Sequence, residues 1–124
     1  MTGRVLLIED EPNIIEAIGF ILTRDGWTVH THSDGATAAD RVRELPPDMV
    51  ILDVMLPGRS GFDILRDLRT GGGAGAAVPI LMLTARGQDA DRDLAMGLGA
   101  TRYMTKPFAN ADIRDAVREM VAAA

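Results

Sequence analysis

The sequence predicts an α/β protein, a three-layer α/β/α sandwich built on a five-stranded parallel sheet. Strand-like and helix-like patterns alternate five times along the 124 residues. Strands separated by helices pair in parallel through right-handed crossovers. The three most apolar runs belong at the centre of the sheet, because central parallel strands are buried on both faces. The expected strands cover residues 4–8, 27–31, 49–52, 79–83 and 101–104.

The first two helices have clear start and stop signals. Pro12 opens the first helix, where its missing N–H costs little, and Gly26 ends it in the left-handed conformation. Asp34 is the expected cap of the second helix, and Pro46-Pro47 stops it. The expected inward side chains are Ile14, Ile18, Ile21 and Leu22 in the first helix, and Ala36, Ala39 and Val42 in the second.

Capping residues also delimit the last three helices. Ser60 caps the third helix, Gly99 ends the fourth and Asn110 caps the fifth. The glycine-rich segment 71–77 has the composition of a flexible surface loop. The expected inward side chains are Phe62, Leu65 and Leu68 in the third helix, Ala90, Leu94 and Leu98 in the fourth, and Ile113, Val117, Met120 and Val121 in the fifth.

Composition narrows the class of protein. The length fits one domain over residues 1–124, with 47% hydrophobic and 25% charged residues. A net charge of -5 argues against nucleic-acid or membrane binding by this domain. The sequence has no cysteine, and Met1 to Arg4 lead directly into the first strand, so neither a disulfide framework nor a signal peptide is expected. A cytoplasmic location follows as the expectation.

Polar residues of a particular kind stand where the apolar runs stop. Glu9 and Asp10 follow the first run, Asp53 follows the third, Thr84 follows the fourth, and Lys106 comes just after the fifth. Ligands bind at the carboxyl edge of open α/β sheets. Three carboxylates, a hydroxyl and an ammonium at one edge therefore predict a site for a hard divalent cation and a phosphoryl group.

The same residues predict a chemistry. Two like charges at ~4 Å repel by about 4 kcal/mol at an effective dielectric of 20, so clustered carboxylates need a cation. Magnesium suits an all-oxygen site that has few protein ligands. Beside magnesium and Lys106, the Asp53 carboxylate is a competent nucleophile toward phosphorus, and Thr84 is placed to hydrogen-bond a phosphoryl oxygen.

Four motifs, in order and spanning the whole chain, carry a family resemblance. The chain resembles the receiver domain of bacterial two-component response regulators, a flavodoxin-like, CheY-like fold with sheet order 2-1-3-4-5. One such motif alone would be weak, whereas four in order at family-like spacings carry the resemblance. The motifs are Leu7-Ile8-Glu9-Asp10-Glu11-Pro12; Asp53-Val54-Met55-Leu56-Pro57-Gly58 with Gly61-Phe62-Asp63; Leu83-Thr84-Ala85-Arg86; and Gly99-Ala100 with Tyr103-Met104-Thr105-Lys106-Pro107-Phe108.

The resemblance implies a role for each metal-site residue. Asp53 would be the phosphoacceptor, and Mg²⁺ (or Mn²⁺) would be bound by Asp10, by Asp53 and by the backbone carbonyl of Met55. Glu9 would act mainly through a metal-bound water. Met55 lacks a side-chain amide to orient water and, with Arg86, occupies a position that tunes hydrolysis in the family. We therefore expect a long-lived phosphoaspartate.

The resemblance also implies how phosphate is held and read out. The backbone N–H groups of Met55 and Ala85, the Thr84 hydroxyl and Lys106 would hold the phosphoryl oxygens, and the peptide bond before Pro107 would be cis. Thr84 and Tyr103 would act as switch residues that repack the face formed by the fourth helix, fifth strand and fifth helix. A static, half-buried role for Tyr103 remains the alternative.

Partners follow from the family. The domain would accept phosphate from a sensor histidine kinase or a histidine phosphotransfer protein and control an output partner or effector domain. It would promote its own phosphorylation and dephosphorylation without turning over a separate substrate. Thr101-Arg102 and Ala116 replace charges that many relatives use for a symmetric contact, so any homodimer is expected to be weak or phosphorylation-dependent.

Other readings of the same residues remain open. The chain could be a docking module that is never phosphorylated, although its acidic, hydroxyl and lysine set is complete. It could be an aspartyl-phosphate hydrolase, but those enzymes usually place an aspartate where Met55 stands. His30 and His32 lie on one side of a short strand, and without a third ligand we interpret them as solvated.

Overall fold

The computed structural model describes residues 3–85 and 89–124 and contains a single five-stranded sheet within them. All neighbouring strands run parallel, in the order β2-β1-β3-β4-β5, which confirms the predicted topology. The strands are β1 (Arg4–Ile8), β2 (Thr28–His32), β3 (Met49–Asp53), β4 (Ile80–Thr84) and β5 (Arg102–Thr105).

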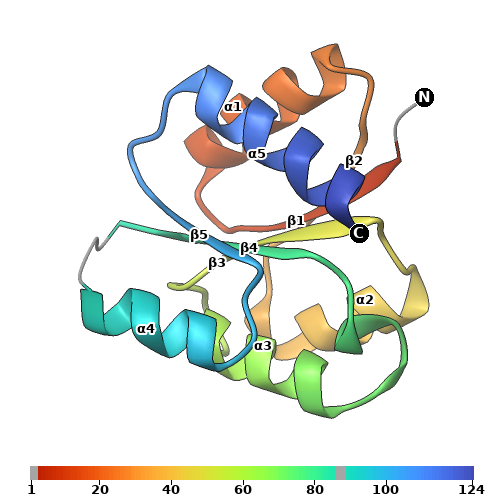
Figure 1. The fold of residues 1–124 in the computed structure, drawn as a ribbon, viewed down its shortest axis with the longest axis vertical. Helices are drawn as coiled ribbons and strands as arrows, with labels where there is room; N and C mark the ends of the chain where they lie inside the picture. The colour runs from red at the N-terminus through yellow and green to blue at the C-terminus, as the bar shows by residue number, and fades with distance from the viewer. Residues whose placement is uncertain (1–2, 86–88) are drawn as a thin grey trace.

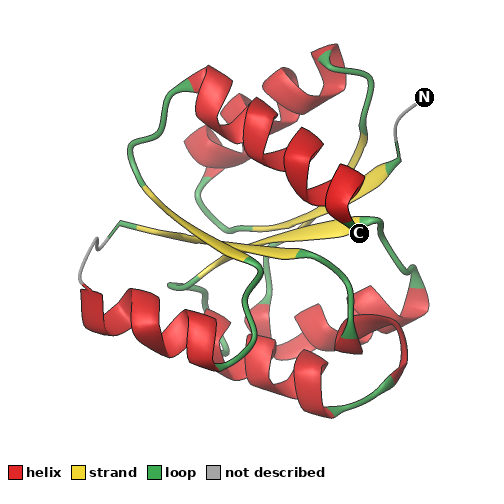
Figure 2. Cartoon of the chain, in the orientation of Figure 1, coloured by secondary structure: helices red, strands yellow, loops and turns green. Residues whose placement is uncertain are grey.

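Helices cover both faces of the sheet, as Figures 1 and 2 show. On one face lie α1 (Pro12–Arg24) and α5 (Asn110–Ala123); on the other lie α2 (Ala38–Glu44), α3 (Gly61–Thr70) and α4 (Asp89–Gly97). Two short 3-10 helices, η1 (Gly35–Thr37) and η2 (Gly73–Ala76), complete the described elements. No helix in the described ranges has the length and apolar character needed to span a bilayer.

Alternating strand side chains build two separate core layers. In β1, Leu6 and Ile8 pack under α2, α3 and α4, whereas Val5 and Leu7 pack under α1 and α5. Every residue of β3 and β4 is buried, while the edge strands β2 and β5 are only partly covered. The apolar runs therefore occupy the central positions that their composition predicted.

Several helix boundaries follow the sequence signals. The Ser60 hydroxyl accepts a hydrogen bond from the Phe62 N–H (3.1 Å) and caps α3. Gly26 and Gly99 follow their helices with φ of +93° and +105°, in the left-handed region that glycine tolerates best. Trp27, expected within the second strand, is buried just before it.

The start of the second helical segment differs from the prediction. Asp34 does form a cap, accepting from the Ala36 N–H (2.9 Å), but it caps η1 and not α2. Gly35 packs so closely against the backbone of the segment before α3 that a Cβ there would lie 2.5 Å from the Arg59 carbonyl oxygen. Gly35 is itself buried, Ala36 is exposed, and Ala38 is the buried alanine instead.

The prediction was also wrong for parts of the last two helices. In α4 the buried residue is Ala95, while Ala90 and Leu94 are exposed, because helical period alone does not choose between two adjacent apolar stripes. In α5 the N-cap is Ala109, so Asn110 is the first helical residue. The Asp112 carboxylate accepts from the Ala109 N–H (3.4 Å) in place of the expected cap.

The glycine-rich segment is more ordered than its composition suggests. It forms η2, in which Gly75 is buried against Leu68 and accepts a hydrogen bond through its carbonyl from Arg69 (3.1 Å). Because the segment precedes β4, it lies at the amino edge of the sheet, away from the predicted site.

Candidate functional site

The residues singled out at the strand ends meet at the carboxyl edge of the sheet. Glu9 and Asp10 follow β1, Asp53 is the last residue of β3 and Thr84 the last of β4. Since β1, β3, β4 and β5 are consecutive neighbours in the sheet, their ends lie side by side. Lys106, just beyond β5, completes the group and donates its backbone N–H to the Thr84 carbonyl (2.7 Å).

Lys106 links two of the carboxylates directly. Its Nζ lies 2.8 Å from Glu9 Oε1 and 3.4 Å from Asp53 Oδ1. The Lys106 side chain is only 13% exposed, and both carboxylates are buried, so these ion pairs are shielded from solvent. Segments separated by 97 and 53 positions in the chain thus supply a single ionic cluster.

Glu9 is fixed by hydrogen bonds on both oxygens. Oε1 accepts from Lys106, while Oε2 accepts from the backbone N–H groups of Asp10 (3.1 Å) and Glu11 (3.2 Å). The residue has no solvent exposure. With its oxygens engaged in this way, Glu9 fits a supporting position near a cation better than a direct coordinating one.

The environment of Asp53 favours its protonated form. Burial and the nearby negative charge of Glu9 raise the pKa of Asp53 to about 6, although Lys106 opposes this shift. Burial tends to lower the pKa of Lys106, but its hydrogen bond to Glu9 and attraction from Asp53 outweigh burial and raise it. The positive charge that the protein itself places near Asp53 is therefore too small to offset burial and the charge of Glu9 when Asp53 is ionised.

A divalent cation would supply that missing charge. One carboxylate oxygen from each of Glu9, Asp10 and Asp53 lies within 4.8 Å of the other two, and among described residues this is the one such group of three. All donors are oxygens, the ligand type that Mg²⁺ prefers. Asp10 is exposed, which leaves an open side for retained waters and a phosphoryl donor. The residues present thus fit Mg²⁺.

The cluster opens into a cleft of about 430 Å³. Met55 and Ala85 line it, as the sequence predicted. Glu11 and Pro12, expected only as part of the first motif and the start of the first helix, also line it. Their position directly after Asp10 was the available signal, because residues that follow a strand-end ligand border the same edge.

The remaining predicted residues lie around this cleft. Thr84 is 1% exposed at the end of β4. Tyr103 lies on β5, half-buried against the core layer under α2, α3 and α4, and paired in register with Met82. The Lys106–Pro107 peptide bond is cis. Arg86 lies outside the described residues.

The fold and the site define a class of protein: a flavodoxin-like α/β domain with an acidic cleft where its strands end. The response regulator receiver domain family matches residues 5–118, and the chain belongs to this family. Receiver domains are phosphoacceptors that act with histidine kinases and effector domains. The chain is accordingly a phosphorylation-dependent signalling switch.

Solved structures agree with this assignment. The receiver domain of sensor histidine kinase PA1611 from Pseudomonas aeruginosa PAO1, with magnesium in its active-site cleft, is 28% identical (TM-score 0.89; 98% of this chain and 99% of that one covered). The BeF3-activated receiver domain of Klebsiella pneumoniae RstA is 30% identical (TM-score 0.87; 95% of this chain and 97% of that one covered). Chemotaxis response regulator CheY4 of Vibrio cholerae is 26% identical (TM-score 0.89; 97% of this chain and 99% of that one covered).

Proposed function

We propose that Asp53 is the phosphoacceptor of this switch and that a sensor histidine kinase or a histidine phosphotransfer protein supplies the phosphoryl group. The observation that carries the proposal is the buried cluster in which Lys106 Nζ lies 3.4 Å from Asp53 Oδ1, beside Glu9 and Asp10. An oxygen of Asp53 forms the new bond to phosphorus while the donor's phosphorus–nitrogen bond breaks and its imidazole is released.

The surrounding residues would stabilise the transferring group. Lys106 is placed to move its hydrogen bond from Asp53 to a phosphoryl oxygen, and Thr84 supplies a hydroxyl. Met55 and Ala85 line the same cleft, and their backbone N–H groups would hold phosphoryl oxygens. Mg²⁺, or Mn²⁺ with the same oxygen preference, would neutralise negative charge while held by Asp10, Asp53 and the Met55 carbonyl.

Phosphorylation would act on the face formed by α4, β5 and α5. Thr84 pairs in register with Thr105 on β5, two residues beyond Tyr103, so a change at Thr84 reaches the strand that carries Tyr103. This face would bind and control the output partner. We take residues 1–124 to form a single domain that acts in the cytoplasm. Arg102 pairs with Glu119 of the same chain (3.0 Å) and Ala116 is buried, which supports at most a weak homodimer.

Mass spectrometry after incubation with acetyl phosphate and Mg²⁺ tests the assignment. We expect one adduct of about 80 Da, roughly one HPO3 unit, mapping to Asp53. Asp53→Asn should abolish it, whereas Asp40→Asn, a control on α2, should label like the wild type. An adduct on another residue, or none, would contradict the proposal and favour a docking module. Sustained turnover of phosphate esters would instead revive the hydrolase interpretation.

A further inference from the structure

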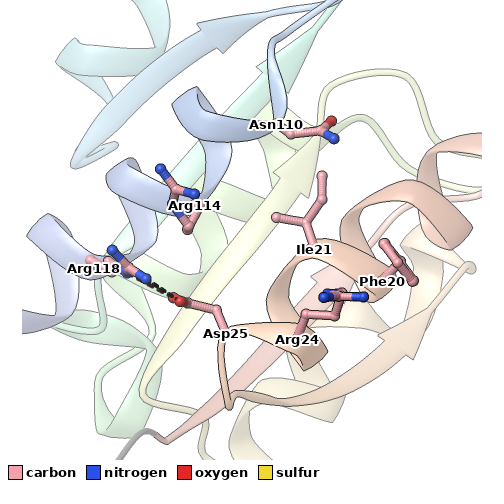
Figure 3. Close-up of a pocket in the computed structure, with 7 residues that line it drawn as sticks. All are labelled: Phe20, Ile21, Arg24, Asp25, Asn110, Arg114 and Arg118. Carbon is pink, nitrogen blue, oxygen red and sulfur yellow. Dashed lines mark hydrogen bonds and ion pairs between the residues drawn. The ribbon is translucent and has the colours of Figure 1, made fainter.

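A groove between α1 and α5 gathers positive charge on a chain whose net charge is negative. Figure 3 shows Arg24 on α1 and Arg114 and Arg118 on α5 around this groove, which has a volume of about 300 Å³. None of its lining residues lines the acidic cleft around Asp53. We call it the arginine groove.

An exposed aromatic side chain borders the arginine groove. Phe20 is 62% exposed, and the Arg24 guanidinium lies 5.4 Å from the centroid of its ring. Exposing a large aromatic ring to water is unfavourable, and a cation over its face reduces that cost only partly. Aromatic residues and arginine are also the types that most often dominate the energetics of protein interfaces.

The charges in the groove are incompletely balanced. Asp25 is its one lining carboxylate, and Arg118 binds it with both Nε (2.9 Å) and Nη2. Arg114 Nε lies 3.2 Å from the exposed Asp115 carboxylate, while no described carboxylate lies within ion-pair distance of Arg24. The groove therefore presents excess positive charge next to an apolar surface.

This combination selects one kind of occupant. A second copy that brought its own arginine groove to this surface would place arginines opposite arginines, which disfavours an isologous contact. We propose that the arginine groove docks an acidic segment of a partner protein, with carboxylates at Arg24 and Arg114 and an apolar side chain on Phe20. The groove shares no lining residue with the phosphoryl site, and it shares α5, but neither α4 nor β5, with the proposed output face.

Trp27 provides a built-in reporter for the groove. It is the only tryptophan in the chain, and its Nε1 donates to Asp25 Oδ2 (3.1 Å), the carboxylate that Arg118 also binds. Carboxylates bound at Arg24 and Arg114 would lie in the same groove as Asp25 and would alter the surroundings of the indole that donates to it. Titration with a tryptophan-free amphipathic peptide of glutamate and leucine should therefore change Trp27 fluorescence, whereas the matched lysine–leucine peptide should not.

Matched variants separate the groove from bulk charge. Arg24→Gln with Arg114→Gln should weaken binding of the glutamate–leucine peptide by about tenfold or more, with a smaller salt dependence. Arg66→Gln with Arg92→Gln removes the same charge from α3 and α4 and should change affinity by less than about twofold. Likewise Phe20→Ala should weaken binding, and Leu94→Ala, which truncates another exposed apolar side chain, should not.

Each alternative has a distinct outcome. Equal losses in the groove and control variants would show attraction to bulk charge only and would overturn the proposal. Wild-type self-association in sedimentation velocity that disappears in the Arg24→Gln, Arg114→Gln variant would assign the groove to a second copy and would also overturn it. Because the titration uses unphosphorylated protein, failure of phosphorylation at Asp53 would leave its result unaffected.

Discussion

At the scale of single residues, Asp53 owes its chemistry to neighbours far away in the sequence. Glu9 supplies negative charge, Lys106 supplies positive charge, and burial removes the water that would otherwise solvate all three. A pKa raised to about 6 means that the metal-free protein bears an energetic cost whenever Asp53 is ionised. This cost is what cation binding would relieve.

The pH dependence of unfolding should reveal this cost. In unfolded chains the pKa of Asp53 is the ordinary 3.8 of an aspartate, whereas in the folded protein it is about 6. As pH rises from 3.8 to about 6, the free energy of unfolding of the wild type should therefore fall relative to that of Asp53→Asn by up to about 3 kcal/mol. Above about pH 6 the difference between the two proteins should stay constant. Urea unfolding of both proteins in EDTA measures this difference, and parallel pH profiles would contradict the prediction.

The side chain of Met55 should make the phosphorylated state long-lived. Its side chain is 66% exposed beside Asp53 and carries no amide or carboxylate to orient an attacking water. Phosphate loss should therefore be slow, and Met55→Asn should accelerate it by roughly tenfold by positioning a water. Mass spectra taken during decay, after removal of acetyl phosphate, provide both half-lives; a rapid wild-type decay would count against this role.

At the scale of elements, Arg69 joins the end of α3 to two loops. Its guanidinium donates to the carbonyls of Gly99 (2.8 Å) and Gly75 (3.1 Å), and burial lowers its pKa from the usual range. Gly99 forms the turn between α4 and β5 with a φ of +105°, and a Cβ there would lie 2.9 Å from Arg69 Cγ. Arg69 thus holds the turn that leads into the Tyr103 strand.

Two neighbouring glycines should respond differently to the same substitution. Gly99→Ala should destabilise the protein by about 1–3 kcal/mol, because alanine is strained at positive φ and its methyl group meets Arg69. Gly97→Ala, in the last turn of α4 with open space around its Cα, should be neutral or stabilising by up to about 1 kcal/mol. Chemical denaturation compares them, and equal effects would show that this turn carries no such constraint.

At the scale of the whole molecule, the folded sheet itself assembles the cation site. Glu9, Asp10 and Asp53 come from two strand ends that pairing of β1 with β3 makes neighbours. Their mutual repulsion is a cost of folding that a bound cation offsets, so cation binding and folding are linked.

Magnesium should therefore raise the melting temperature. At a concentration near 100 times its Kd, Mg²⁺ should add about 2.7 kcal/mol to the free energy of unfolding. Asp10→Asn should remove most of this gain, while Asp40→Asn should retain it because α2 lies away from the cleft. Differential scanning fluorimetry with and without EDTA tests this, and an equal response in both variants would point to nonspecific screening.

Features that depend on sequence patterns and motifs were predicted correctly, whereas some that depend on packing between layers were not. Strand order, the convergence of Glu9, Asp53 and Lys106, and the cis bond before Pro107 were all expected and are confirmed. In α4 the prediction was right for Leu98 and wrong for Ala90 and Leu94, because the helical period alone does not show that Ala95 is the buried residue. Such choices depend on which side chain fits the neighbouring layer, which a linear pattern does not contain.

By itself, the sequence determined the alternation of strands and helices, the polar residue at each strand end and the family to which these motifs point. Local physics suffices there, since apolar period and capping chemistry act over a few residues. Only the tertiary structure decided that both oxygens of Glu9 are engaged, that Asp53 has a raised pKa, and that Arg24 and Arg114 border one groove. Those properties arise from burial and from charges that meet only once the chain has packed.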